Sequence, residues 1–314
     1  MHLKHSVKTI CQNLIPGFRA TATLAAALLL AAAFPASATT IDRIKETGQI
    51  NLGYIAEGRP FTYSAGGGAP EGYGVDLCLK VVERAKTQLS LGQLKVNWVP
   101  VTKVDYLSQV KDGGVDLLCT PMNETLERRK EVSFSISVFP GGIRAVMRKD
   151  AAVALRDALG DTPAQRALWR GSPAAKVLSK KSFGVVSGTT SEDWLGREIS
   201  MFQIDSKIVP VANYQEGVKS LLDRKIDVFF GDRAVVLGAM DAAASQKLVV
   251  LDRLLTFEPY ELALARGDDD FRLLVDSTLS EVYAAPGFGE QFYKWFGEYD
   301  VKTRLFFQWN IVQP

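Results

Sequence analysis

Hydrophobic and polar residues alternate along the chain in two patterns, one typical of buried strands and the other of amphipathic helices. The run "INLGYI" (50–55) predicts a strand, and "VDLCLKVVERAKTQL" (75–89) predicts a helix because its apolar residues return every three or four positions. The segments "KVNWVPV", "VDYLSQVKDGG" and "VDLLC" then predict a strand, a helix and a strand. This β-α-β-α-β order indicates a parallel sheet.

The same order of elements restarts near Arg144. The segments "RAVMRK", "SFGVV", "KIVPV" and "IDVFFGD" have the pattern of strands, and "YQEGVKSLLDRK" has that of a helix. Residues 151–181 form an insert rich in Ala and Arg, either helical or irregular. We therefore expect two α/β lobes of similar construction. Open sheets of this kind bind their ligands at the carboxyl ends of the strands.

Composition places the chain among globular proteins. It has 314 residues, of which 47% are hydrophobic and 23% charged, which suits one or two domains. Near the start, Lys4, Lys8 and Arg19 precede the apolar stretch "ATATLAAALLLAAAF" and an Ala-x-Ala sequence that ends at Ala38. This is the pattern of a secretory signal peptide, and its apolar stretch is shorter than the ~20 residues of a membrane span. We expect cleavage after Ala38 and a periplasmic location.

Removal of residues 1–38 changes the chemistry that is available. Both histidines, His2 and His5, lie in this segment, so the mature chain has no imidazole for a catalytic triad or a histidine zinc site. The formal charge falls from +2 to −1, because three basic and no acidic residues are removed; this does not support nucleic-acid binding. No cofactor or metal is expected. Cys78 and Cys119 remain, either as a disulfide or as two buried thiols.

Six short segments occur in an order that resembles a known family. They are "GYGVDLC", "GGVDLL", "TLERRKEVSFS", "SGTTSE", "IDVFFGD" and "FYKWF". Together they are similar to the solute-binding proteins of family 3, the periplasmic amino-acid receptors of ABC importers. The closest likeness is to the glutamate/aspartate-binding branch, with which "VTKVDYLSQVKDGGVDL" and "LERRKEVSFS" align without gaps.

This resemblance implies a two-lobed α/β fold of type II, in which each lobe is a mostly parallel sheet flanked by helices and two crossing strands join the lobes. We expect lobe 1 to comprise residues 39–143 and 267–314, and lobe 2 residues 144–266, with the crossing strands near Ile143 and Arg266. It also implies a monomer that binds an amino acid between the lobes without chemical change. A membrane permease would then recognise the closed form.

A free amino acid is a zwitterion, and a dry cleft must supply a cation for its carboxylate and an anion for its ammonium group. Arginine suits the carboxylate because its planar guanidinium can donate two parallel hydrogen bonds. The family's T-x-x-R pattern corresponds to Thr125 and Arg128, which makes Arg128 the expected carboxylate partner. The alternative is a surface ion pair between Arg128 and Glu124. Arg129 and Lys130 are expected to be solvated.

The second lobe is expected to complete the site. The segment "SGTT" follows a strand and opens a helix, so Ser187, Thr189 and Thr190 would offer hydroxyl and backbone donors to the carboxylate. The alternative is an ordinary helix cap. Asp232 follows the apolar strand "IDVFF", at the position where the family holds the ligand ammonium. A helix-capping role for Asp232 is left open as well.

Several positions depart from the branch that the chain most resembles. Pro121, Met122 and Asn123 stand where many relatives have small hydroxyl residues, which removes a backbone donor at Pro121. Only Asn123 remains there as a polar contact. Ile55 occupies the position of an arginine that grips an acidic side chain in this branch.

Other positions agree with that branch or offer neutral contacts. Arg144 matches a second arginine of the branch, and Tyr214 replaces a histidine. Tyr54 and Phe61 are also expected to line the site. Because a site that bonds a polar group rejects analogues that lack it, we predict a polar or acidic amino acid rather than leucine or valine. The preference for glutamate or aspartate should be moderate.

Two other functions fit the same resemblance. The chain could be an exported enzyme of the same fold, such as a dehydratase of small carboxylates, with Arg128 holding the substrate and Glu57 or Glu124 as general acid. It could also be a sensory subunit that docks on a membrane receptor. The prediction retained here is a binding protein and not an enzyme, since no pair of carboxylates is singled out by the sequence.

Overall fold

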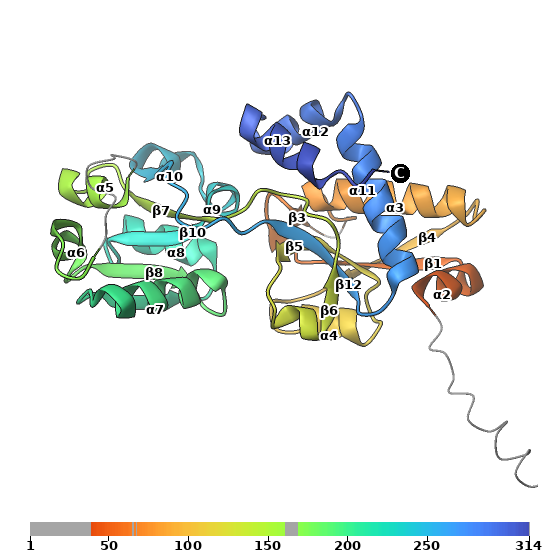
Figure 1. Ribbon diagram of the computed structural model, residues 1–314, viewed down its shortest axis with the longest axis horizontal. Helices are drawn as coiled ribbons and strands as arrows, with labels where there is room; N and C mark the ends of the chain where they lie inside the picture. Colours follow the sequence, from red (N-terminus) through yellow and green to blue (C-terminus); the bar gives the residue numbers. More distant parts are fainter. Residues whose placement is uncertain (1–38, 65, 67, 161–168, 314) are drawn as a thin grey trace, which may run out of the picture. The chain divides into compact units, whose positions relative to one another are not determined.

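A computed structural model describes residues 39–64, 66, 68–160 and 169–313 (Figure 1). The expected signal peptide, residues 1–38, lies outside the described residues. Within the described ranges, none of the helices combines the length and the hydrophobicity that a transmembrane span requires.

The first of two five-stranded sheets has the strand order β4-β1-β5-β12-β6. Its strands are β1 (Gln49–Tyr54), β4 (Lys95–Pro100), β5 (Leu117–Asn123), β6 (Val132–Phe134) and β12 (Tyr260–Ala265). β1, β4 and β5 are parallel, and β12 is antiparallel to β5 and β6. A hairpin of β2 (Glu57–Gly58) and β3 (Thr62–Tyr63) follows β1.

Helices pack on both faces of the first sheet. They are α2 (Thr40–Thr47), α3 (Tyr73–Gln88), α4 (Tyr106–Lys111), α11 (Asp269–Ala284), α12 (Phe288–Phe296) and α13 (Val301–Asn310). Figure 1 shows α3 and α11 on one side of the sheet and α4 on the other. Accordingly, the core that contains Leu77 and Leu274 is separate from the core that contains Val110 and Leu118. The apolar periodicity of 75–89 thus corresponds to a helix whose inner face is buried.

The second sheet has the order β11-β7-β10-β8-β9. Its strands are β7 (Ile143–Arg148), β8 (Ser182–Val186), β9 (Lys207–Val211), β10 (Val228–Asp232) and β11 (Leu248–Val250). Around it lie α5 (Val153–Leu159), α6 (Pro173–Leu178), α7 (Thr190–Phe202), α8 (Tyr214–Leu222), α9 (Arg233–Ala239) and α10 (Ala242–Lys247). β8, β9 and β10 are parallel, and β7 is antiparallel to β10 and β11. The expected fold class, a two-lobed α/β fold of type II, is confirmed, and each sheet is mixed rather than mostly parallel.

Strand β12 lies in a different lobe from the one we expected for its residues. We expected residues 144–266 to form lobe 2, but β12 pairs with β5 and β6 of the first sheet. Its central residues are buried on both sides, as a strand between two neighbours requires. The chain therefore returns to the first sheet before Tyr260, and not near Arg266. The other expected lobe boundaries remain a proposal.

Two crossing segments, residues 138–142 and 256–260, join the sheets and pair with each other. Val138 N–H donates to Tyr260 O at 2.7 Å, and Tyr260 N–H donates to Phe139 O at 2.9 Å. Further along, Glu258 N–H donates to Gly141 O at 2.9 Å. These backbone hydrogen bonds fix the positions of the side chains that the crossing segments carry.

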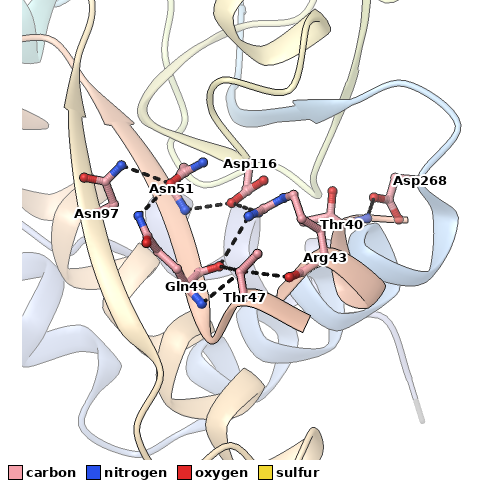
Figure 2. Close-up of polar contacts among 8 residues, drawn as sticks. All are labelled: Thr40, Arg43, Thr47, Gln49, Asn51, Asn97, Asp116 and Asp268. Carbon is pink, nitrogen blue, oxygen red and sulfur yellow. Dashed lines mark hydrogen bonds and ion pairs between the residues drawn. The ribbon is translucent and has the colours of Figure 1, made fainter. Parts of the chain in front are cut away.

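Polar contacts hold α2 against the first sheet (Figure 2). Arg43 donates to the carboxylate of Asp116, which also accepts the backbone N–H of Asn51 at 2.6 Å. The backbone N–H of Thr40 donates to Asp268 at 2.8 Å. Burial raises the pKa of the Asp116 carboxyl, and its hydrogen bonds and Arg43 oppose that rise. The helix is therefore anchored to both the sheet and the start of α11.

Helix α3 and strand β5 are joined by a disulfide between Cys78 and Cys119, both fully buried. Helix and strand approach closely because position 74 is glycine. A Cβ atom at Gly74 would lie 1.9 Å from the carbonyl oxygen of Cys119. Of the two alternatives left open by the sequence, the structure therefore has the bonded pair.

Thiol titration checks this disulfide in solution. Residues 39–314, unfolded without reductant, should show no free thiols, because both remaining cysteines are consumed in one bond. After reduction the same titration should find two thiols. Detecting two before reduction would contradict the pairing.

Candidate functional site

A cavity of about 60 Å³, called here the site cavity, lies between η1 (Arg128–Lys130), the ends of β5 and β10, the starts of α7 and α8, and the crossing segments. It is lined by Asn123, Arg128, Gly142, Ile143, Thr189, Thr190, Ser191, Tyr214, Asp232, Glu258 and Tyr260. Backbone pairing positions several of these residues. Tyr260 lies opposite Asn123 in the β12–β5 ladder, and Asp232 lies opposite Ile143 in the β10–β7 ladder.

Arg128 supplies the guanidinium group of the site cavity. Thr125 begins the short 3-10 turn by accepting Arg128 N–H on its hydroxyl at 3.1 Å, but Thr125 does not line the cavity. The guanidinium donates to the backbone oxygen of Asn123 at 2.7 Å and to its side-chain oxygen at 2.6 Å. Glu124 pairs with Arg129 at 2.5 Å, so the alternative ion pair with Arg128 is not formed.

Asp232 is both a helix cap and a lining residue. It ends β10, and one carboxylate oxygen accepts Ala234 N–H at 2.8 Å, which caps α9. The other oxygen accepts Gly142 N–H at 2.9 Å. Burial raises the pKa of Asp232 to about 6, although these backbone hydrogen bonds and Arg144 act in the opposite direction. The helix-capping role is therefore confirmed, and the ammonium-binding role stays a prediction that the place of Asp232 in the cavity lining allows.

The start of α7 contributes hydroxyl groups. Thr189 donates its hydroxyl to Val186 O at 2.7 Å and forms no side-chain cap. Thr190 donates its hydroxyl to the carboxylate of Glu258 at 2.5 Å and accepts the side-chain amide of Asn123 at 2.7 Å. These hydrogen bonds of Thr190 thus join the end of β5, the start of α7 and a crossing segment.

Two tyrosines line the cavity as neutral hydrogen-bonding groups. Burial raises the pKa of Tyr214 far above its usual range, and the Asp232 and Glu258 carboxylates raise it further. The pKa of Tyr260 is also raised well above normal by burial and by nearby carboxylates. The Lys103 ammonium lies 5.3 Å from the centre of the Tyr214 ring, within the range of a cation–π contact.

Glu258, Tyr260 and Ser191 are lining residues that sequence reasoning missed. Glu258 accepts the side-chain amide of Asn123 at 2.8 Å in addition to the Thr190 hydroxyl. The sequence signal for Glu258 was its position in "TFEPYELAL", just before an apolar stretch with the pattern of a strand. It was overlooked because the return crossing was expected near Arg266.

Three other expected residues lie away from the site cavity. Phe61 is buried in the aromatic core, with its ring centre 5.0 Å from that of Phe139. Tyr54 packs edge-on against Trp98, with ring centres 6.2 Å apart. Ser187 is exposed, and its backbone N–H donates across to β9. Their side chains are therefore used in packing or face solvent.

Arg144 lines a second, larger cavity of about 770 Å³ and not the site cavity. Its guanidinium donates to the backbone oxygen of Asp252. The second cavity shares Gly142 and Asp232 with the site cavity, but its other walls include both apolar and charged residues, many of them on α9, α12 and α13. The structure therefore does not place Arg144 in the lining of the site cavity, where we expected it to contact a ligand side chain.

Substitution of Arg144 tests this correction. Arg144→Met should weaken binding by about fivefold or less, under ~1 kcal/mol, and equally for glutamate and glutamine. The residue acts only indirectly, through its effect on the pKa of Asp232. Titration calorimetry with both ligands measures the two factors. A selective loss of glutamate affinity would restore Arg144 to the ligand site.

The lining groups suit a small zwitterion better than a metal. Arg128 provides a cation, Asp232 and Glu258 provide carboxylates, and hydroxyl and amide groups surround them. Among the described residues, no cluster of three or more His, Cys, Asp or Glu side chains is placed to hold a metal ion. The site can therefore bind opposite charges at separate points.

Comparison with known proteins gives matches over nearly the same span. The L-glutamate/L-aspartate-binding protein of Pseudomonas aeruginosa is 30% identical over 286 residues, 90% of this chain and 88% of that protein. The glutamate/aspartate import solute-binding protein of Escherichia coli is 26% identical over 283 residues, 88% of this chain and 87% of that protein. An ancestral amino acid-binding protein, a precursor of cyclohexadienyl dehydratase, has a TM-score of 0.65 and 24% identity, over 82% of this chain and all of that one.

Residues 50–298 match the family described as bacterial extracellular solute-binding proteins, family 3. This span contains both sheets except Gln49, the first residue of β1, and every residue that lines the site cavity. The family expected from the sequence is therefore confirmed: the chain belongs to the bacterial extracellular solute-binding proteins of family 3.

Proposed function

We propose that this protein is a periplasmic receptor that captures a polar amino acid in the site cavity and delivers it to the permease of an ABC importer. The observation that carries the proposal is the presence of Arg128 and the buried Asp232 in the same cavity. Arg128 is assigned to the α-carboxylate and Asp232 to the α-ammonium. Thr190 and the start of α7 supply further donors to the carboxylate.

The names of two relatives support the proposed receptor function. Those in Pseudomonas aeruginosa and Escherichia coli are glutamate/aspartate-binding proteins, and the latter serves import. By the same likeness we propose that the chain is exported through residues 1–38 and acts as a monomer. Ligand binding would favour a closed arrangement of the lobes, which the permease recognises.

We further propose that the chain is not an enzyme. Glu124 pairs with Arg129, and Glu57 is exposed on β2, so neither of the acids considered for a dehydratase lines the site cavity. The likeness to a precursor of cyclohexadienyl dehydratase concerns the fold. Mass spectrometry of small carboxylates after incubation with the protein tests this point. Their conversion to products would contradict a binding role.

Thermal-shift screening against the amino acids tests the proposed function. A ligand at 100 times its dissociation constant stabilises the folded state by about 2.7 kcal/mol, which raises the unfolding temperature measurably. We expect a polar amino acid to stabilise the protein while leucine and valine do not. If no amino acid raises the unfolding temperature, the proposal fails.

A further inference from the structure

The site cavity contains one more carboxylate than an amino-acid backbone requires. Glu258 extends from a crossing segment whose backbone is fixed by Gly141. One oxygen of Glu258 accepts hydrogen bonds from Asn123 and Thr190. Within the described part of the chain, its second oxygen accepts none. Glu258 is therefore a lining carboxylate with unused acceptor capacity.

The remaining charges of the cavity have other assignments. Asp232 already accepts backbone N–H groups from Gly142, Ala234 and Val235 at 2.9, 2.8 and 3.5 Å. A carboxylate offers about four acceptor positions, so Asp232 has room for the α-ammonium and little more. Glu258 is then left without a cationic partner. Glu258 is half-buried, so a cation supplied by the ligand would find a partly desolvated anionic partner there.

Because the site cavity is small, the negative charge of Glu258 determines which ligand side chains can be accommodated. A cavity of about 60 Å³ holds only a few water-sized positions. An entering amino acid must therefore displace the contacts that join Asn123, Thr190 and Glu258. A ligand side chain that donates a hydrogen bond to Glu258 replaces the hydrogen bonds lost from Asn123 and Thr190. A ligand side chain that is a carboxylate instead places a second negative charge beside Glu258.

Apart from Arg128, no described residue of the lining would neutralise an acidic ligand side chain. Arg128 is the only Lys or Arg among the described residues that line the site cavity, and it is assigned to the α-carboxylate. Arg144 opens onto the second cavity. Ile55, at the position of the branch's other arginine, is apolar.

We propose that Glu258 binds the side chain of the ligand, and that the ligand is a basic amino acid such as lysine or arginine rather than glutamate or aspartate. This inference rests on the proposed function and narrows its ligand class. Neutral side chains with an amide donor, such as that of glutamine, should bind more weakly than basic ones. Among the polar amino acids, those with acidic side chains should bind most weakly.

Titration calorimetry with lysine, arginine, glutamine and glutamate, on the wild type and on Glu258→Gln, tests the inference. Glutamine retains the shape of Glu258 and an oxygen that accepts from Asn123 and Thr190, but it removes the charge. We expect Glu258→Gln to lower the affinity for lysine and arginine about 30-fold or more, because one partner of a buried charge pair is lost. Glutamine affinity should change by less than about fivefold, because no charge pair is lost.

Glu124→Gln is the matched control. It removes a carboxylate four residues from Arg128 that pairs with Arg129 outside the cavity. Glu124→Gln should bind the four amino acids with the same affinities, and in the same order of affinity, as the wild type. Retained glutamine binding by Glu258→Gln shows that the variant is folded.

The outcomes separate this inference from the proposed function. If glutamate binds tightest, the basic-ligand assignment is overturned and the receptor function stands. If Glu258→Gln weakens all ligands equally, Glu258 only positions the cavity and the inference is also overturned. If no amino acid binds to the wild type, the proposed function itself fails. Should the variant not fold, the order of affinities in the wild type still decides.

Discussion

Arg128→Met should weaken amino-acid binding by about 100-fold or more, because a buried ligand carboxylate would lose its cationic partner while remaining desolvated. Methionine has a similar reach but donates no hydrogen bond. The guanidinium also donates to both oxygens of Asn123, so its loss leaves that side chain less firmly held. Titration calorimetry gives the affinity, and thermal unfolding shows whether the variant remains folded.

Arg129→Met is the control for this experiment. Arg129 is adjacent in sequence and equally charged, but its side chain is exposed and pairs with Glu124. Its substitution should leave affinity unchanged within error, since exposed ion pairs contribute little. Equal losses in both variants would mean that net charge near the site, and not the Arg128 contact, controls binding.

Asp232→Asn should weaken binding by about 30-fold or more, ~2 kcal/mol, because the ammonium loses its anionic partner. The new amide retains an oxygen that accepts Ala234 N–H and caps α9. Its NH2 group, however, would face the N–H of Gly142, which now donates to Asp232. A moderate loss of stability should therefore accompany the loss of affinity. Unchanged affinity in a folded variant would mean that Glu258 or another group holds the ammonium.

The pH dependence of binding gives Asp232 a distinct signature. Its pKa in the free protein is raised to about 6, and ammonium binding requires the carboxylate. Affinity should therefore be full above pH 7 and fall as pH drops through 6. In Asp232→Asn this fall should disappear. Burial raises the pKa values of Tyr214 and Tyr260, so these tyrosines do not change charge in this range.

The ionisation of Asp232 should affect folding stability and ligand affinity in opposite directions as pH changes. Its folded pKa lies above the unfolded value of 3.8, so the folded state binds the proton more tightly. The contribution of Asp232 to stability is therefore present below pH 4 and is lost as pH rises through 6. Glu261, with a pKa raised to about 7, adds a similar dependence of stability. It lies outside the site cavity, so it should not affect the pH dependence of binding.

Local patterns predicted those parts of the fold whose partners are adjacent in sequence. The period of apolar residues in 75–89 was sufficient for α3, since one helix face alone carries the information. The lobe to which β12 belongs was predicted wrongly. Its neighbours, β5 and β6, are more than a hundred residues away, and apolar content alone does not specify a partner.

The same limitation explains which site residues were missed. Arg128 and Asp232 follow recognisable segments, whereas Glu258 acquires its position from pairing between the two crossing segments. Arg144 shows how strand periodicity decides a role. Its neighbour Ile143 lines the site cavity, and Arg144, one residue further along β7, opens onto the second cavity. Successive side chains of a strand face opposite sides, so an error of one position reverses the assignment.

The most direct test of the receptor assignment is a crystal structure of residues 39–314 with the bound amino acid identified by the thermal-shift screen. We predict that the ligand occupies the site cavity, with its α-carboxylate on the Arg128 guanidinium and its α-ammonium on Asp232. Density for the ligand in the second cavity beside Arg144, or a ligand carboxylate with no contact to Arg128, would contradict the account.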